Sequence, residues 1–322
     1  MATLNSTIRI RSAKSNANLG SRGFLPKEML RSWQLYVLVL PTLLFILIFQ
    51  YIPMYGVVIA FKNFKPSLGI LGSPWTGFRH FLRFFDSPSF WRLIENTLTL
   101  SLYQLIASFP VPIILALSLN IIPGTRFKKA VQLVTYAPHF ISTVVVVGMM
   151  SLFFSTNYGI VNNTISALGG DRQFFLGKPE LFQSFYVWSN IWQSTGWASI
   201  IYLAALSGVD PCLHEAAIVD GANFGQRIWH IDIPAILPTI AILLILNVGR
   251  LMSVGFEKVY LMQNALNLDK SEIISTYVYK VGLLQAQYSF ASAVGLFNSI
   301  INFVLLIAVN KTAKAIGQQG LW

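Results

Sequence analysis

The chain has 322 residues, of which 54% are hydrophobic and only 11% carry a charge. An ordinary soluble domain carries about 25% charged residues, so this composition argues against a soluble domain and indicates a membrane protein. A net charge of +11 raises nucleic acid as a partner, but the basic residues stand between long apolar segments, where the positive-inside rule accounts for most of them. We therefore expect no nucleic-acid partner.

Long uncharged segments predict an all-α membrane protein, because a helix needs about 20 apolar residues to cross the hydrocarbon core of a bilayer. Six spans are expected, over residues 33–61, 94–122, 130–154, 181–206, 234–256 and 289–310. Residues 1–32 form a basic tail that lacks the apolar core and cleavage site of a signal peptide. Placing this tail in the cytoplasm puts both termini there, with residues 33–322 as one transmembrane domain.

The segment from 62 to 92 is expected outside, yet it carries five basic residues against Asp86. This is contrary to the positive-inside trend. Two interpretations stay open. The segment is either a surface helix lying at the lipid headgroups, or the source of a positive field that favours an anionic substrate or an acidic docking face.

Polar residues inside the spans mark candidates for a solute path. Asn190, Gln193 and Trp197 lie at i, i+3 and i+7 in the fourth span and share a helix face. They either form interhelical hydrogen bonds or line a path for a polyhydroxylated solute. Asn247 and Arg250 share a face of the fifth span, where a wet cavity is favoured over an arginine that reaches out to the interface. The candidate path residues are Asn190, Gln193, Trp197, Asn247, Arg250 and Asn298.

Residues 209–233 connect the fourth and fifth spans and carry the most specific pattern in the chain. Asp210 and Pro211 predict the start of a short helix, and Gly221 predicts its end. The residues follow E-A-A-x3-G-x9-I-x-L-P, with Ile233 in place of Leu. The chain thereby resembles the permease subunits of bacterial ABC importers, whose signature loop has this pattern.

The resemblance extends over nearly the whole chain, including Thr135-Tyr-Ala-Pro-His-Phe-Ile-Ser142 and Val219-Asp-Gly-Ala-Asn-Phe224. These segments are similar to carbohydrate-type permeases, above all to the branch that imports oligosaccharides and polysaccharide fragments, such as the first permease subunit of the alginate importer. The resemblance implies a type I importer fold in the bacterial inner membrane. A basic outer loop and Arg250 would suit an acidic, uronate-rich sugar, while neutral or methylated fragments stay open.

The resemblance also implies partners. The loop 209–233 would dock on a cytoplasmic ATPase, with Glu215 as the polar contact, Ala216 and Ala217 small enough for close seating, and Gly221 turning the chain back. The coupling residues of the motif are then Glu215, Ala216, Ala217, Asp220, Gly221, Ile231 and Pro234. The family implies a second homologous permease, two copies of the ATPase and an extracytoplasmic solute-binding protein. ATP and magnesium would be bound by the ATPase, and no cofactor by this chain.

Other function classes find less support. We see no Walker sequence and no catalytic constellation, so we expect no enzyme. Cys212, His214 and His230 lack the spacing of a zinc site, so no metal is expected. A secondary transporter would show carboxylates within its spans, whereas Glu95 and Glu257 stand at span ends. The remaining alternative is an importer permease of the same family for an amino acid, peptide or ion.

Overall fold

The computed structural model describes residues 33–122, 124–315, 317 and 320–321, so the basic tail expected over residues 1–32 lies outside the described residues. The described part of the chain is helical, with one isolated antiparallel bridge between Lys62 and Trp75 and no strand. It falls into two compact units, divided between Tyr55 and Gly56.

The first unit is an apolar helical segment. It consists of α2 (Trp33–Ile46), the π turn η1 (Leu47–Tyr51) and α3 (Ile52–Met54). None of the side chains in these three elements is buried. A helix that is apolar all round, without a polar face, requires an apolar environment such as lipid. Pro53 has no backbone N–H to donate, and the π turn η1 ends just before it, where α-helical geometry resumes at Ile52.

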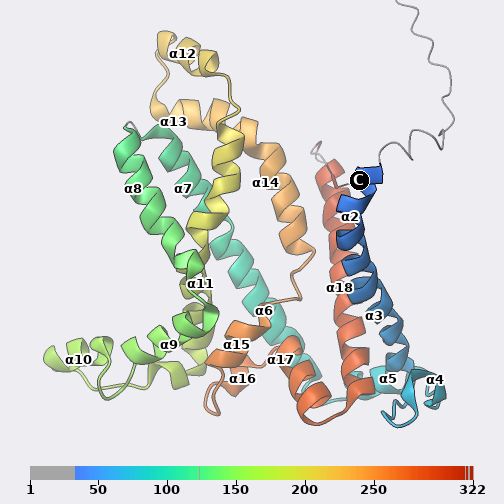
Figure 1. Ribbon diagram of the computed structural model, residues 1–322. Helices are drawn as coiled ribbons and strands as arrows, with labels where there is room; N and C mark the ends of the chain where they lie inside the picture. Colours follow the sequence, from blue (N-terminus) through green and yellow to red (C-terminus); the bar gives the residue numbers. More distant parts are fainter. Residues whose placement is uncertain (1–32, 123, 316, 318–319, 322) are drawn as a thin grey trace, which may run out of the picture. The chain divides into compact units, whose positions relative to one another are not determined.

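The second unit contains the remaining helices, the first of which begins at Tyr55, one residue before the division. Their bounds are η2 (Tyr55–Phe61), α4 (Gly69–Gly72), α5 (Arg79–Phe85), α6 (Phe90–Ser108), α7 (Pro110–Ile121), α8 (Thr125–Tyr136), η3 (Ala137–Phe140), α9 (Thr143–Phe153), α10 (Ile160–Ala167), η4 (Phe175–Gly177), α11 (Pro179–Leu206), α12 (Pro211–Val219), α13 (Phe224–Arg227), η5 (Ile228–Asp232), α14 (Ile233–Val248), α15 (Phe256–Met262), α16 (Leu268–Ser271), α17 (Ile274–Tyr279), η6 (Lys280–Leu284) and α18 (Tyr288–Ala315). The numbering is that of Figure 1.

Helix α11 is the central element of this unit. It packs against α6 and α7 along its length and also contacts α8, α14 and α16 (Figure 1). The largest buried cluster joins α6, α9, α11 and α15, with Leu100, Val187 and Val259 fully buried. A second cluster around Phe84 and Phe290 ties α5 to α18. Burial of these side chains, at about 25 cal/mol per Å² of apolar surface, holds the short helices α15–α17 against the long ones.

Within the described residues, four helices are long and apolar enough to cross a membrane. They are Trp33–Phe61, Phe90–Ile121, Phe224–Val248 and Tyr288–Ala315. Two bent pairs raise the number to six if each pair is one span: Thr125–Phe140 with Thr143–Phe153, and Pro179–Leu206 with Pro211–Val219. The all-helical membrane fold expected from the sequence is thus present, and the expected cytoplasmic position of the termini stays a prediction.

Two expected helices differ from the structure. The expected continuous helix over residues 130–154 is broken by 98° between η3 and α9. Pro138 lies in η3, and the Ser142 hydroxyl caps a new helix by accepting the N–H of Val145. Likewise, the helix expected over 234–256 ends at Val248. There Gly249 packs against Leu306 of α18, and the N–H of Met252 donates to the Asn302 side chain, so contacts with α18 replace the next helical turn.

The other helix boundaries shift only at their ends. Helix α11 begins at Pro179, two residues before the expected start, and the segment expected from residue 94 begins at Phe90. Helix α18 continues to Ala315, beyond the expected end at residue 310. Such ends depend on caps and on neighbouring chain segments more than on the apolar run itself.

Candidate functional site

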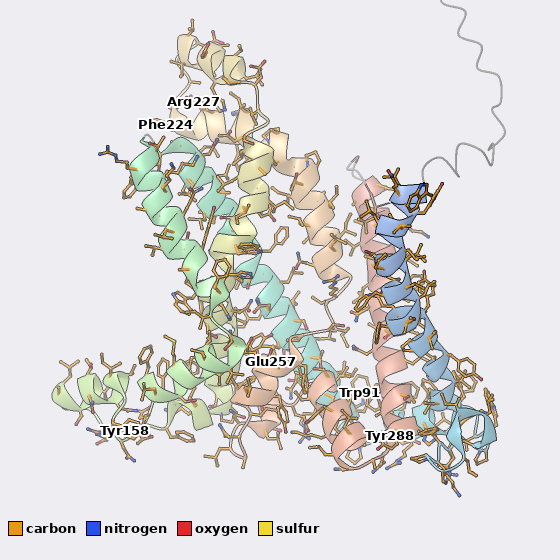
Figure 2. The ribbon with its side chains drawn as sticks, viewed as in Figure 1. Trp91, Tyr158, Phe224, Arg227, Glu257 and Tyr288 are labelled. Carbon is orange, nitrogen blue, oxygen red and sulfur yellow. The ribbon has the colours of Figure 1, made fainter. Side chains whose placement is uncertain are left out.

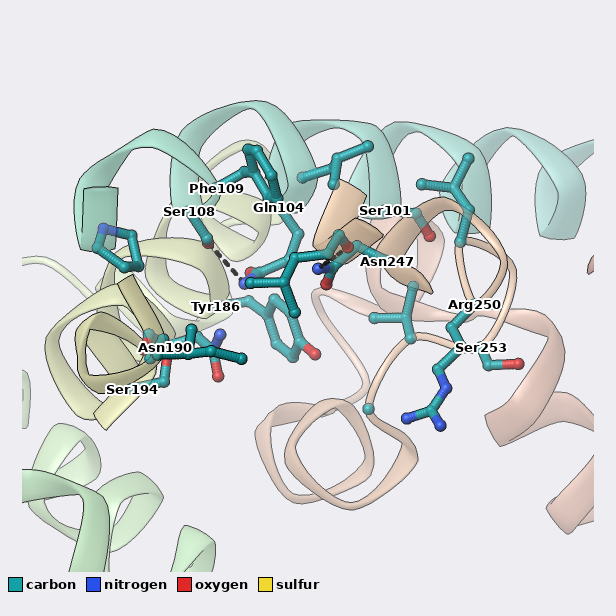
Figure 3. A pocket seen from close by; sticks show the side chains of 18 of the residues that line it. Ser101, Gln104, Ser108, Phe109, Tyr186, Asn190, Ser194, Asn247, Arg250 and Ser253 are labelled. Carbon is teal, nitrogen blue, oxygen red and sulfur yellow. Dashed lines mark hydrogen bonds between the residues drawn. The ribbon is translucent and has the colours of Figure 1, made fainter. Parts of the chain in front are cut away.

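A cavity of about 530 Å³ lies between α6, α11 and the segment around the end of α14 (Figure 3). Its lining combines hydroxyl, amide and guanidinium groups with apolar side chains. The lining residues are Ser101, Gln104, Leu105, Ser108, Phe109, Pro112, Tyr186, Asn190, Ser194, Ala198, Ile201, Tyr202, Leu243, Asn247, Arg250, Leu251, Ser253, Val254 and Gly255. The volume is that of an ordinary small-molecule site.

Helix α6 contributes one polar wall. Ser101, Gln104 and Ser108 stand at i, i+3 and i+7 and therefore share a helix face. The Gln104 Nε2 donates to the Ser108 Oγ at 2.6 Å. Within the described part of the chain the buried Oε1 of Gln104 has no hydrogen-bond partner. A water or a solute hydroxyl would satisfy this acceptor, which otherwise costs free energy.

The opposite walls come from α11 and from the end of α14. Figure 3 shows Asn190 and Ser194 on α11, across the cavity from Arg250 and Ser253, which follow α14. The Asn247 Nδ2 donates to the Leu243 carbonyl at 2.7 Å, which leaves its side-chain oxygen as an acceptor. Arg250 is exposed. The cavity can therefore offer several neutral hydrogen-bonding groups and one fixed positive charge to a polar solute.

The structure separates the candidate path residues into two groups. Asn190, Asn247 and Arg250 line the cavity, whereas Gln193, Trp197 and Asn298 do not. The Gln193 Nε2 donates to the Ile141 carbonyl at 2.8 Å, and Trp197 stacks on His139 with ring centroids 4.5 Å apart. Asn298 lies on α18, where its Oδ1 is buried. The role of each as a path residue stays a prediction.

The reason for this division is that the polar stripe of α11 is wider than the cavity. Positions 190 and 194 meet the cavity, while 193 and 197 meet η3 and the chain that follows it. Arg250 was expected on the same helix face as Asn247. It instead lies in the turn after α14, because that helix ends at Val248.

Sequence reasoning missed the wall formed by α6. Ser101, Gln104 and Ser108 were left out of the candidate set, although a polar stripe at i, i+3 and i+7 inside an apolar span could have identified them. Tyr186 was missed as well, since nothing local distinguishes it from the other aromatic residues of α11.

A second candidate site is the connection between α11 and α14. Helix α12 begins as expected, because the Asp210 Oδ1 accepts the N–H of Cys212 at 2.9 Å. Gly221 then takes a positive φ of 79°, a conformation that favours glycine. The α12 helix has no buried residue, and its Leu213, Ile218 and Val219 are exposed. An exposed apolar surface of this kind indicates a docking surface for another protein.

The motif residues surround two hollows beside α12. Ala217, Asp220, Gly221 and Ile231 line one of about 310 Å³. Glu215 borders a larger one of about 480 Å³. Ala216 is exposed on α12, and Pro234 stands in the first turn of α14. Six of the seven motif residues thus lie on or beside α12, with Pro234 a short distance along the chain; their coupling role stays a prediction.

The two histidines of this connection contact different partners. His214 Nε2 lies 3.4 Å from Asp232 Oδ1, and His230 Nδ1 lies 2.9 Å from the Gln226 carbonyl. On α13, the Arg227 guanidinium stacks 4.6 Å above the Phe224 ring (Figure 2).

The aromatic residues Trp91, Tyr158 and Tyr288 lie at the opposite end of this unit from α13 (Figure 2). Aromatic residues of this kind are frequent where a protein meets a membrane interface.

Known proteins resemble this chain in sequence. A family described as "Binding-protein-dependent transport system inner membrane component" matches residues 108–317. The polygalacturonan/rhamnogalacturonan transport system permease protein YteP of Bacillus subtilis is 44% identical, over 92% of either chain. Protein LplB of the same organism is 46% identical over 89% of this chain and 91% of its own.

Two solved structures are also similar to this chain. A chain of a bacterial alginate ABC transporter, crystallised in complex with an alginate pentasaccharide-bound periplasmic protein, superposes with a TM-score of 0.84 and 42% identity. The match covers 92% of this chain and 99% of that one. A second structure of a bacterial ABC transporter involved in the import of the acidic polysaccharide alginate gives a TM-score of 0.83 and 43% identity.

Proposed function

Because the chain belongs to the family of binding-protein-dependent transport system inner membrane components, we propose that this multi-pass permease imports acidic oligosaccharides released from polysaccharides. The energy comes from ATP hydrolysed by a partner subunit. The solute crosses by alternating access, with the cavity between α6, α11 and α14 as part of its path.

The observation that carries the proposal is the lining of this cavity. Amide and hydroxyl groups of Gln104, Asn190 and Asn247 can exchange hydrogen bonds with sugar hydroxyls. Arg250 adds a guanidinium, whose planar fork matches the two oxygens of a carboxylate. Relatives that are named for polygalacturonan and alginate, both acidic polymers, support the same class of solute.

A neutral oligosaccharide is the second candidate. Arg250 is the only charged residue of the cavity lining, and the remaining polar groups are neutral. Those groups would bind an uncharged or methylated fragment equally well. The two candidates differ in what they require of Arg250, and this difference defines the test.

The connection around α12 serves as the docking element for the ATPase in our proposal. Glu215 makes the polar contact, and the small Ala216 and Ala217 allow close seating, so the α12 end faces the cytoplasm. Support comes from the exposed apolar side chains of α12 and from the positive φ of Gly221, which turns the chain back toward α14. We further propose one second homologous permease, two ATPase copies and a solute-binding protein as the complete assembly.

Affinity isolation of the detergent-solubilised protein tests the assembly. The wild type should retain an ATPase and a second permease, and Glu215→Arg should lose the ATPase. Glu180→Arg is the matched control, because Glu180 is an exposed carboxylate in the first turn of α11. A wild type that is isolated alone, and is unaffected by Glu215→Arg, contradicts the importer assignment.

Uptake into proteoliposomes tests the solute. A mixture of galacturonate oligosaccharides is compared with maltooligosaccharides, each with the cognate binding protein present. We expect uptake of the acidic mixture, reduced about tenfold or more by Arg250→Ala, because a hydrogen bond to a charged group contributes about 1.5–3 kcal/mol. Arg250→Lys should retain part of the activity. Uptake of the neutral mixture alone, insensitive to Arg250→Ala, would establish the neutral candidate instead.

A further inference from the structure

Three polar side chains from three separate elements meet behind α12. Asp232, at the end of η5, is only 1% exposed. Its Oδ1 accepts a hydrogen bond from the Nδ2 of Asn120 on α7 at 3.4 Å. The same Oδ1 lies 3.4 Å from the Nε2 of His214 on α12. Asn120 precedes Asp232 by 112 positions, so only the folded chain brings the two together.

This cluster bridges an open space. The hollow of about 480 Å³ separates α12 from the ends of α7 and α11, and Asn120, His214 and Asp232 all border it. Helix α12 buries none of its own residues. Consequently α12 is not packed firmly against the helices behind it, and the contact from His214 to Asp232 spans the gap.

The backbone on both sides of α12 is poorly suited to transmit a movement. On one side the chain bends by 76° between α11 and α12. On the other side it turns at Gly221, with a φ of 79°, before it reaches α13. Turns of this kind can swing, because few buried contacts hold them. A side-chain contact that joins α12 directly to the membrane helices would remove this freedom.

The burial of Asp232 makes the contact specific. A carboxylate removed from water requires hydrogen-bonding partners, and here two of them are supplied by Asn120 and His214. Nearby Arg227 stacks on Phe224 and makes no hydrogen bond to Asp232 in the described part of the chain. Position 232 is also the unconstrained x of I-x-L-P, so the signature pattern does not require a carboxylate there.

We propose that His214, Asp232 and Asn120 form a strut that transmits the movement of α12 to the cytoplasmic ends of α7 and α14. These are positioning residues, which touch neither ATP nor the solute. The inference rests on the proposed docking of α12 to an ATPase. When α12 moves with the ATPase, the strut carries α7 and α14 with it, and the cavity lined by Asn247 at the far end of α14 changes its access.

The test follows cavity access during nucleotide binding. Cys212 is the only cysteine of the chain, so Cys212→Ala supplies a cysteine-free background for Asn247→Cys as reporter. The full assembly, with its ATPase and second permease, is placed in lipid nanodiscs. We measure the rate at which a charged maleimide labels the reporter, with and without Mg-ATP and vanadate, and we measure nucleotide binding and ATPase retention in parallel.

We expect nucleotide to change the labelling rate of the otherwise wild-type assembly at least threefold. His214→Ala and Asp232→Asn should reduce this change to less than 1.5-fold, while ATPase retention and nucleotide affinity stay within twofold of the unaltered assembly. His214→Gln, which keeps an N–H donor, should restore part of the response. His230→Ala is the matched control, because His230 is exposed and lies beside the Gln226 carbonyl.

The outcomes separate this inference from the function on which it rests. A full nucleotide response in His214→Ala and Asp232→Asn overturns the strut and leaves the importer assignment intact. An unaltered assembly that binds nucleotide without any change at the reporter contradicts the coupling role of α12 itself. Loss of ATPase retention in the strut variants would overturn the strut as well, since the cluster would then belong to the docking surface.

Discussion

Gly196 on α11 packs directly against the backbone of Thr135 on α8: a Cβ at position 196 would overlap with the carbonyl oxygen of Thr135. This contact joins the central helix to the first half of the broken pair α8–α9. Backbone atoms cannot rotate away as a side chain can. The close approach therefore depends on glycine at this one position.

Gly196→Ala should lower the thermal stability of the purified protein strongly. Overpacking of a tight contact costs about 1–3 kcal/mol, and here the neighbour is a rigid carbonyl. Thermal unfolding in detergent, followed by intrinsic tryptophan fluorescence, measures the change. Gly148→Ala in α9 is the control, because nothing lies within 4 Å of its Cβ position. It should be neutral or stabilising, and equal unfolding temperatures for the two variants would contradict the prediction.

Asn96→Ala should loosen the segment that contains α16 and α17. Asn96 is buried on α6 and its Nδ2 donates to the carbonyls of Asp269 at 2.7 Å and Glu272 at 3.0 Å. Asn96→Ala would leave these two carbonyls without their partner, and a buried polar group without a partner lowers the free energy of unfolding by about 1–3 kcal/mol. Hydrogen exchange should become faster across residues 268–279.

The matched variant for this measurement is Asn163→Ala, which truncates an exposed side chain in α10. It should leave exchange of residues 268–279 unchanged. Unaltered exchange in both variants would show that the two carbonyls find other partners.

Lys258→Met should stabilise the protein near neutral pH. Lys258 is only 5% exposed, its Nζ has no hydrogen-bond partner in the described part of the chain, and its burial lowers its pKa from 10.5 to about 8. The charged form therefore destabilises the folded state, by about 3 kcal/mol at pH values below 8. Methionine fills a similar volume without the charge.

The pH dependence of this effect has a definite sign. Between pH 8 and 10.5 the unfolded chain binds more protons at Lys258 than the folded one, so the stability of the wild type rises with pH in this window. The difference in unfolding temperature between wild type and Lys258→Met should accordingly shrink from pH 7 to pH 10. A constant difference across this range would contradict the burial of a charged Lys258.

Gly221→Ala should weaken the attachment of the ATPase, while Gly221→Asn should be tolerated better. Gly221 has a φ of 79°, which costs an ordinary L-residue about 1–2 kcal/mol, and asparagine adopts such a conformation more readily than alanine. Nothing lies within 4 Å of the Cβ position, so the effect is conformational and not steric. The yield of ATPase in affinity isolation ranks the three proteins, and identical yields would contradict the prediction.

Local sequence information was sufficient for much of the helical pattern. Long apolar runs place α11 to within two residues at its start, because a membrane span needs a minimum length of apolar surface. The cap at Asp210 and the turn at Gly221 could also be predicted, since both depend on residues adjacent in the chain. The family could be recognised for the same reason, because the signature pattern is confined to one loop.

The remaining features of the fold and of the site depend on packing between segments that are distant in the sequence. Gly249 and Met252 meet α18, and these contacts end α14 early and move Arg250 off the helix face on which the periodicity placed it. The α6 wall of the cavity and the separation of Asn190 from Gln193 likewise depend on which neighbours α11 has. Asn120 reaches Asp232 only through the fold, because hydrogen bonds between remote residues depend on three-dimensional proximity, which helix periodicity does not encode.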